Sequence, residues 1–366
     1  MLCHNSAIDV MDNTMNSMTQ INQRGMFEDQ FGRQKRKLRI SVTDRCNFRC
    51  VYCMPEHPEW MNKKELLSFE ELYAFCHFMV QHGVEQIRIT GGEPLMRHGV
   101  VNFIQQLQQL KSLGLKRISM TTNGHYLVQF AERLKQAGLD DLNISLDSLD
   151  PTQFKQLTKQ VLEPVLEGIQ AAKQVGLPIK INTVLMKGIN ENQIIPLVKW
   201  AHSHHFEPRF IEFMPLDGDQ KWTKHSVVSE QEILNFLSRE FDVITQQGQG
   251  ADPARRYVVN GQYVGIISTI SNSFCDTCDR LRMNAQGEFF NCLFAQKGFG
   301  LKAEIQQLLN QDPVVQLQAQ LDLQNKLGVY IWNKAKGYQA LQTELQKTNP
   351  VHVSQASKIS MHMIGG

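Results

Sequence analysis

The stretch KLRISVTDRCNFRCVYC, residues 37–53, joins a β-strand pattern to three closely spaced cysteines. Its first seven residues are rich in β-branched side chains, which favour a strand. Cys46, Cys50 and Cys53 then follow at spacings of four and three. A structural zinc site normally has four protein ligands, so a set of three cysteines at the end of a strand needs an explanation.

Segments like residues 37–43 recur along the chain, with helical patterns between them. They are residues 84–90, 115–121, 141–147, 178–185 and 207–213. Six strand–helix units in a row predict parallel strands joined by right-handed crossovers. The expected fold class is therefore α/β, an incomplete (β/α)6 TIM-like barrel. Its chemistry should lie at the carboxyl ends of the strands.

The strand–helix alternation ends after the sixth unit, and the composition of the sequence changes. A Gln/Gly-rich link at residues 246–254 precedes Asn260-Gly261, which predicts a hairpin turn. We therefore expect three parts: a mobile N-terminal segment (1–31), the partial barrel (32–244), and a smaller C-terminal α+β region (245–366).

Composition restricts the class of function. The 366 residues include 38 Lys or Arg and 36 Asp or Glu, so a net charge of +2 gives no general attraction to nucleic acid or to an anionic membrane. Neither a signal peptide nor an apolar run of 18 residues is present. We expect a cytoplasmic protein, in which clustered cysteines indicate metal rather than disulfides.

A second set of three cysteines repeats the first puzzle. Cys275, Cys278 and Cys292 have no histidine near them in the sequence, whereas His57 could complete a zinc site with the first set. Cys76 falls on an apolar helix face and is expected in the core, and Cys3 has no assigned role. An iron–sulfur cubane held by three thiolates leaves one iron open to a small molecule, so three ligands can make a reactive site.

The first cysteine set resembles the signature of the radical S-adenosylmethionine (SAM) superfamily. The spacing is C-x3-C-x2-C with Tyr52 before the last cysteine, and ITGGEP (89–94) follows at the next strand end. The resemblance implies a [4Fe-4S] cluster whose open iron is chelated by SAM. Zinc held with His57 remains the alternative for this set.

The remaining motifs are similar to those of the GTP 3′,8-cyclase family of molybdenum-cofactor biosynthesis. They are residues 38–55, 87–97, 120–124, 143–150, 180–190, 211–216, 275–294 and the terminal IGG, 364–366. This resemblance implies a second [4Fe-4S] cluster in the C-terminal region. It also implies radical conversion of GTP to (8S)-3′,8-cyclo-7,8-dihydroguanosine 5′-triphosphate, in which hydrogen is removed from C3′ and C3′ joins C8.

The resemblance also implies roles for individual residues. The cluster ligands would be Cys46, Cys50, Cys53, Cys275, Cys278 and Cys292. Contacts to SAM would come from Tyr52, Gly92, Ser145 and Met214. Contacts to GTP would come from Arg39, Arg88, Thr121, Lys180, Arg280, Leu281 and Arg282. Residues close to the reaction would be Arg39, Arg280, Arg282, Gly365 and Gly366.

The residues themselves support part of this assignment. Arg280 and Arg282 share one face if their segment is extended, and guanidinium forks match phosphate oxygens. Arg39, Arg88 and Lys180 lie in predicted strands, where parity alone leaves open whether they point into the barrel or outward into surface ion pairs.

The expected partners are GTP, an electron donor and the next enzyme of the pathway, cyclic pyranopterin monophosphate synthase. No nucleic acid or membrane partner is expected, and the chain would be a monomer or a homodimer. Two rival functions remain: a radical SAM enzyme that modifies a peptide and uses the second set as an auxiliary cluster, and a zinc-stabilised RNA-binding module. The near-neutral charge speaks against the RNA-binding module.

Overall fold

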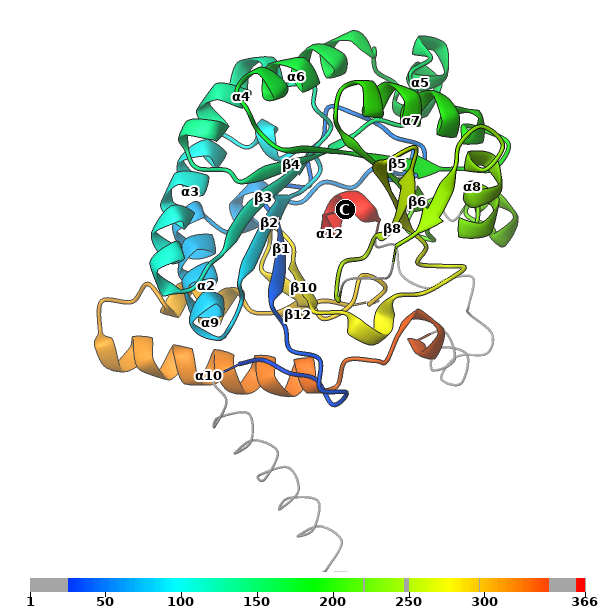
Figure 1. The fold of residues 1–366 in the computed structure, drawn as a ribbon. Helices are drawn as coiled ribbons and strands as arrows, with labels where there is room; N and C mark the ends of the chain where they lie inside the picture. Colours follow the sequence, from blue (N-terminus) through cyan, green and yellow to red (C-terminus); the bar gives the residue numbers. More distant parts are fainter. Residues whose placement is uncertain (1–25, 220, 247–249, 296, 342–359, 366) are drawn as a thin grey trace, which may run out of the picture.

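A single twelve-stranded sheet, curled into an open barrel, organises the chain (Figure 1). The computed structural model describes residues 26–219, 221–246, 250–295, 297–341 and 360–365. The sheet order is β12-β11-β10-β1-β2-β3-β4-β5-β6-β9-β8-β7. Its first six strands are β1 (Lys37–Ser41), β2 (Gln86–Thr90), β3 (Arg117–Thr122), β4 (Asp141–Ser145), β5 (Ile179–Leu185) and β6 (Glu207–Glu212). They are parallel and adjacent in chain order, so the predicted six-unit barrel is confirmed.

Helices between these strands cover the outside of the barrel (Figure 1). They are α2 (Phe69–Gln81), α3 (Val100–Leu107), α4 (Leu127–Gln136), α5 (Pro151–Thr158), α6 (Glu163–Gln174), α7 (Ile194–Ser203) and α8 (Glu230–Leu237). Short 3-10 turns occur at Lys63–Glu65, Pro94–Met96, Gln108–Leu113, Glu191–Gln193, Lys224–Ser226 and Cys275–Thr277. At the start of α2, Ser68 and Glu71 form a capping box, a signal that can be read from the sequence.

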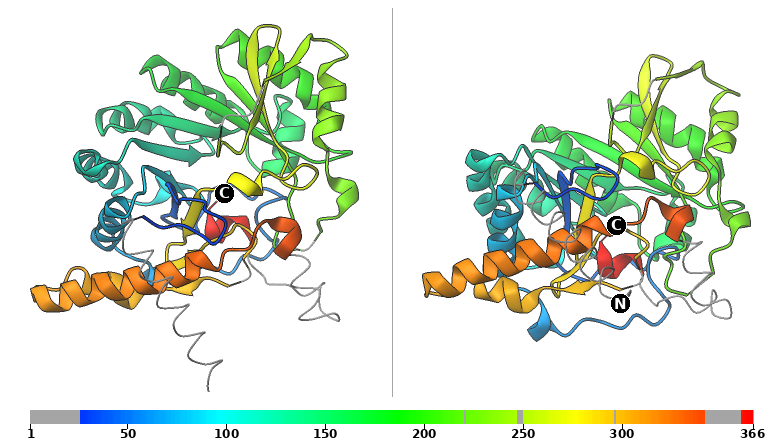
Figure 2. Two further views of the ribbon diagram at one scale, coloured as in Figure 1. Left: turned by 60° about the horizontal axis from the view of Figure 1, so that its bottom comes forward. Right: turned by 90° about the horizontal axis from the view of Figure 1, so that it is seen from below.

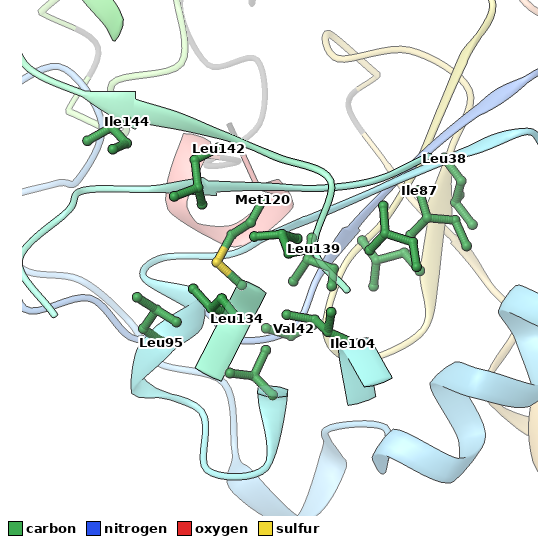
Figure 3. Close-up of a cluster of buried hydrophobic side chains, with 14 of the residues drawn as sticks. Leu38, Val42, Ile87, Leu95, Ile104, Met120, Leu134, Leu139, Leu142 and Ile144 are labelled. Atoms are coloured by element: carbon green, nitrogen blue, oxygen red, sulfur yellow. The ribbon is translucent and has the colours of Figure 1, made fainter. Parts of the chain in front are cut away.

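The apolar core lies between the sheet and the helices, not inside the barrel. Alternate strand residues such as Leu38, Ile87, Met120 and Leu142 are fully buried there, together with helix residues such as Ile104 (Figure 3). Cys76 belongs to this core, as predicted. Since strand side chains alternate between the two faces, the other half of each strand points into the barrel and is free to be polar.

The C-terminal strands extend the barrel sheet at both edges. On one side β7 (Val243–Thr245), β8 (Arg255–Val259) and β9 (Gln262–Ile267) follow β6, and Asn260 and Gly261 make the predicted turn with positive φ. On the other side β10 (Arg280–Met283) pairs in parallel with β1, and β11 (Glu288–Phe290) and β12 (Phe299–Gly300) continue the edge. The region after residue 244 therefore shares the barrel sheet and has no separate sheet among the described residues.

The segment before β1 differs from the prediction. Residues 1–25 lie outside the described residues, but residues 26–31 are not loose, because Phe27 is 1% and Asp29 0% exposed. The Gln30 amide donates to the Trp332 carbonyl at 3.3 Å. This segment thus packs beside the end of α10 (Pro313–Trp332), as Figure 2 shows.

The end of the described chain lies at the carboxyl ends of the barrel strands. After α9 (Lys302–Gln307) and α10, the short helix α12 (Met361–Ile364) is seen in the centre of the barrel in the view of Figure 1 and at one end of it in Figure 2. The Met361 amide donates to the Leu216 carbonyl at 3.0 Å, which ties α12 to the loop after β6. None of the described helices combines the length and the apolar character needed to cross a membrane.

Candidate active site

A cavity of about 420 Å³ fills the interior of the barrel. Its walls come from the inward-facing residues of β1 to β6, from β9 and β10, and from the loops after the strands. The predicted site residues on this wall are Arg39, Cys46, Cys50, Tyr52, Cys53, Arg88, Gly92, Thr121, Ser145, Lys180, Met214, Arg280 and Arg282. The structure therefore brings together residues from opposite ends of the sequence. Strand parity alone had not settled where Arg39, Arg88 and Lys180 point, and all three face inward.

The first cysteine set lies in the loop after β1, at the carboxyl end of the barrel. Phe48 N donates to Cys46 Sγ at 3.3 Å, and the amides of Cys53 and Met54 both donate to the Cys50 carbonyl at 3.0 Å. Burial raises the pKa of all three thiols, that of Cys46 to about 12. These thiols need a strong positive partner to ionise, and soft thiolate donors suit an iron–sulfur cluster. No three His, Cys, Asp or Glu residues in the described ranges lie close enough together to hold a single metal ion.

The two glycines of the ITGGEP motif have a packing reason that the sequence did not reveal. Gly92 N donates to the Thr43 carbonyl at 2.6 Å, and a Cβ on Gly92 would lie 2.5 Å from the Asp44 carbonyl oxygen. Glu93 N donates to the Arg45 carbonyl at 2.8 Å. The absence of side chains on these glycines thus leaves room for the backbone that leads to Cys46. Gly92 still borders the cavity.

Two buried carboxyls brace the same end of the barrel. Tyr52 donates its hydroxyl to Asp147 Oδ2 at 2.7 Å, and burial raises the pKa of Asp147 to about 6. Glu93 accepts from Thr122 Oγ1 at 2.9 Å and from Asn123 N at 2.8 Å, and burial raises its pKa to about 7. Both side chains hold the segments that carry the first cysteine set and its neighbours.

The second cysteine set lies beside the start of β10, which pairs in parallel with β1, so it is at the other end of the strands from the first set. Arg280 Nη2 donates to Cys278 Sγ at 3.7 Å, and Lys334 Nζ donates to the same sulfur at 3.3 Å. Burial would raise the pKa of the Cys278 thiol, but the charges of Arg280 and Lys334 lower it to about 5. The Cys278 amide donates to the Cys275 carbonyl at 3.1 Å, and Cys292 is near enough to interact electrostatically with both cysteines. The cavity reaches their neighbours Phe274, Arg280 and Leu293.

Three arginines stand in one row across the inside of the sheet. Arg39 on β1 is the register partner of Arg88 on β2 and of Arg282 on β10. Burial and the neighbouring guanidinium charges lower the pKa of Arg39, and burial lowers those of Arg88 and Arg282 to about 10. In the described part of the chain none of the three forms an ion pair with a carboxylate. Like charges side by side on adjacent strands are destabilising, so this row calls for an anion.

Other polar groups of the cavity also lack partners. Arg88 Nη1, Asn143 Oδ1 and Asn182 Oδ1 are buried and make no hydrogen bond in the described structure. Asn143 lies on β4 between its register partners Thr121 and Lys180. Buried polar groups are almost always satisfied, so these atoms point to a ligand with donors and acceptors of its own.

The C-terminal tail reaches this wall. Arg282 Nη1 donates to the Gly365 carbonyl at 2.8 Å, and Gly365 has φ of 74°. A Cβ at this position would overlap Thr90 Cγ2. The predicted approach of the tail to the site is therefore seen for Gly365, while Gly366 lies outside the described residues.

One predicted contact is not brought to the cavity. Leu281 has an exposed fraction of 0%, and its side chain lies in the apolar core beyond the sheet, because it alternates with Arg280 and Arg282. Strand alternation would have excluded this side chain.

The same alternation could have found inward-facing residues that the sequence analysis missed. They are Lys37, Arg117, Asn143, Asn182 and Arg209. The first four lie two or four positions from a predicted site residue on the same strand, so their side chains share its face. Arg209 lies two positions from Ile211, which also borders the cavity. Lys334 gave no such signal, because it follows α10, far along the chain from Cys278.

Comparison with known proteins agrees with this geometry. The model of the radical SAM superfamily matches residues 40–201, and that of Molybdenum Cofactor Synthesis C matches residues 206–339. A protein of Streptomyces coelicolor named GTP 3′,8-cyclase is 41% identical over 285 residues, covering 76% of this chain and 83% of its own. One of Staphylococcus epidermidis with the same name is 40% identical over 292 residues, with coverages of 76% and 85%.

Solved structures share the fold. Streptococcus suis SuiB bound to the precursor peptide SuiA superposes with a TM-score of 0.61 at 14% identity, covering 91% of this chain and 73% of SuiB. SuiB bound to S-adenosylmethionine gives a TM-score of 0.60 at 15% identity, with coverages of 85% and 73%. At these identities the likeness extends to the fold alone. With the sequence relatives, the chain belongs to the GTP 3′,8-cyclase family of the radical SAM superfamily.

Proposed function

We propose that the protein is a radical SAM GTP 3′,8-cyclase, which converts GTP to (8S)-3′,8-cyclo-7,8-dihydroguanosine 5′-triphosphate for molybdenum-cofactor biosynthesis. The observation that carries the proposal is the row Arg282, Arg39 and Arg88, which faces the same cavity as the first cysteine set. A triphosphate supplies the negative charge that this row lacks. The guanosine part of the proposed substrate follows from the relatives named GTP 3′,8-cyclase.

The first cysteine set fits a [4Fe-4S] cluster. Among the described residues no fourth donor completes a metal site with the three thiols, which suits a cluster with one open iron. Gly92, Ser145, Tyr52 and Met214 border the same cavity and would hold SAM. Cys46, Cys50 and Cys53 would hold this cluster, which together with SAM would supply the radical chemistry for removing hydrogen from C3′ of GTP. A second [4Fe-4S] cluster on Cys275, Cys278 and Cys292, which would hold the guanine, belongs to the proposal.

The chain's own residues then position and shield the substrate. The buried arginines neutralise phosphate charge, and Thr121, Lys180 and Asn143 form a polar band across β3, β4 and β5 that can orient the nucleotide. The barrel walls around the cavity would limit the access of water and stray hydrogen donors to the reacting carbons. We assign no side-chain nucleophile or general base, because radical chemistry needs neither.

The peptide-modifying alternative has less support. SuiB shares the fold at 14% identity, whereas the relatives named GTP 3′,8-cyclase are about 40% identical over most of the chain. The proposed partners remain an electron donor and the next enzyme of the pathway.

The proposal is tested by anaerobic reconstitution followed by incubation with SAM, a reductant and GTP. We expect about eight irons and eight sulfides per chain, two cubanes of four each, and GTP-dependent formation of the cyclised nucleotide. Replacement of Cys275, Cys278 and Cys292 together by Ala should halve the iron content, and the variant should still cleave SAM. A colourless protein without iron, or one that cleaves SAM but never consumes GTP, would contradict the proposal.

A further inference from the structure

A group of buried cations lies behind the second cysteine set, away from the cavity. Lys334, just after α10, is 3% exposed, and its Nζ donates to Cys278 Sγ at 3.3 Å and to the Arg280 carbonyl at 3.0 Å. Lys35 Nζ donates to the Cys278 carbonyl at 3.0 Å, and Arg33 Nη1 donates to the Cys275 carbonyl at 2.7 Å. Three cations from two distant segments therefore fix the backbone and one sulfur of this set.

The charges in this group do not balance without the cysteines. Asp29 is fully buried and pairs with Arg33 at 2.7 Å and with Lys35 at 2.5 Å. In the described ranges, the acceptors of the Lys334 ammonium are a sulfur and a carbonyl, and no carboxylate is among them. An unpaired buried ammonium is costly, so a negative charge on the Cys278 sulfur is the natural compensation.

We infer that Lys334 is a positioning residue of the second iron–sulfur site, which holds the Cys278 sulfur and places a positive charge beside the cluster. The inference rests on the proposed function, because it requires a cluster on Cys275, Cys278 and Cys292. Hydrogen bonds and charge next to cluster sulfurs set the reduction potential and orient the ligands. A nearby positive charge favours the form with the added electron, so Lys334 raises the potential of this cluster.

A purely structural role is the alternative, since Lys334 also ties down the Arg280 carbonyl. Replacement by Met keeps the length and removes the charge, whereas replacement by Arg keeps the charge. Lys336, two residues on, has an exposed side chain, so Lys336→Met is the matched control. The potential separates the two roles, because a backbone tie alone does not change it.

The experiment uses the full chain with Cys46, Cys50 and Cys53 replaced by Ala, so that the second cluster is seen alone. Each variant is reconstituted anaerobically, and iron content, retention against a chelator and midpoint potential from a dithionite titration followed by EPR are measured. We expect Lys334→Met to shift the potential to more negative values and to retain iron about 10-fold less well. Lys334→Arg should restore the potential, and Lys336→Met should match the parent.

Three results would overturn the inference. The first is an unchanged potential and unchanged retention in Lys334→Met. The second is loss of iron from both cysteine sets when Lys334→Met is made in the chain with all its cysteines, since that marks a general folding role. The third is the absence of iron from the parent variant, the chain with Cys46, Cys50 and Cys53 replaced. That result would show that the second cluster does not form, and it would contradict the proposed function as well as this inference.

Discussion

Arg282 on β10 donates a hydrogen bond of 2.8 Å to the carbonyl oxygen of Gly365, 83 residues further along the chain. This contact ties the segment after α12 to the barrel, and a Cβ on Gly365 would meet Thr90 and Ser41 at the ends of β2 and β1. Arg282 also belongs to the arginine row that we assign to the triphosphate. The tail and the substrate charge therefore meet at one side chain.

Gly365→Ala should lower cyclisation at least about 10-fold, because a left-handed φ costs about 1 kcal/mol in a residue with a Cβ and the added methyl overlaps Thr90. Iron content should not change, since Gly365 has no side chain and is not among the six cysteine ligands. Gly300→Ala is the control, because a Cβ there meets nothing within 4 Å. Full cyclisation activity of Gly365→Ala would show that the C-terminal segment has no role in the reaction.

Arg282→Ala should cost roughly 2–4 kcal/mol of transition-state stabilisation, or about 30- to 1000-fold in kcat/KM for GTP. Arg282→Lys should recover only part of this loss, because a point charge cannot replace a two-pronged contact. Arg133→Ala, on the exposed face of α4, is the control. Arg280 is a less selective test, because it also contacts Cys278 Sγ. Unchanged turnover of Arg282→Ala would refute the phosphate contact.

Asn143→Leu separates a ligand contact from a structural one. Its Oδ1 is buried and unpaired in the described structure, so the substitution should leave the free energy of unfolding unchanged or raise it. Affinity for GTP should fall about 3- to 10-fold, the value of one ordinary hydrogen bond. Equilibrium binding and chemical unfolding of the same preparation check both. A destabilised protein with normal GTP affinity would show that Asn143 only supports the fold.

Glu93 predicts a pH dependence of stability. Burial raises its pKa from 4.5 to about 7, so between these values the folded chain binds a proton that the unfolded chain has lost. Stability should therefore fall by up to about 3 kcal/mol as the pH rises from 5 to 8. In Glu93→Gln this part of the slope should disappear, while exposed Glu132→Gln keeps it. Chemical unfolding at several pH values measures the slopes, and equal slopes in all three proteins would contradict the assignment.

The sequence predicted the six strands and their order because local signals carry them. Strand segments rich in β-branched residues alternate with helical patterns, and Ser68 with Glu71 marks a helix start. It predicted less well where distant parts of the chain meet. The attachment of β10 to β1, the burial of Phe27 and Asp29, and the approach of Lys334 to Cys278 all depend on tertiary packing.

Within the site, motif residues were easier to predict than their surroundings. The inward direction of Arg39 and Arg88 became clear only from the register across three strands. The packing of Gly92 against residues 43–45 was also missed, because two separate loops meet there, while its contact with SAM stays a prediction.

The central claim is that hydrogen leaves C3′ of GTP within this cavity. It is tested most directly with GTP carrying deuterium at C3′, incubated anaerobically with the reconstituted protein, SAM and dithionite. The account predicts deuterium in the 5′-deoxyadenosine formed, in step with formation of the cyclised nucleotide, and loss of both in Arg282→Ala. Formation of 5′-deoxyadenosine without deuterium, with GTP left intact, would contradict the account.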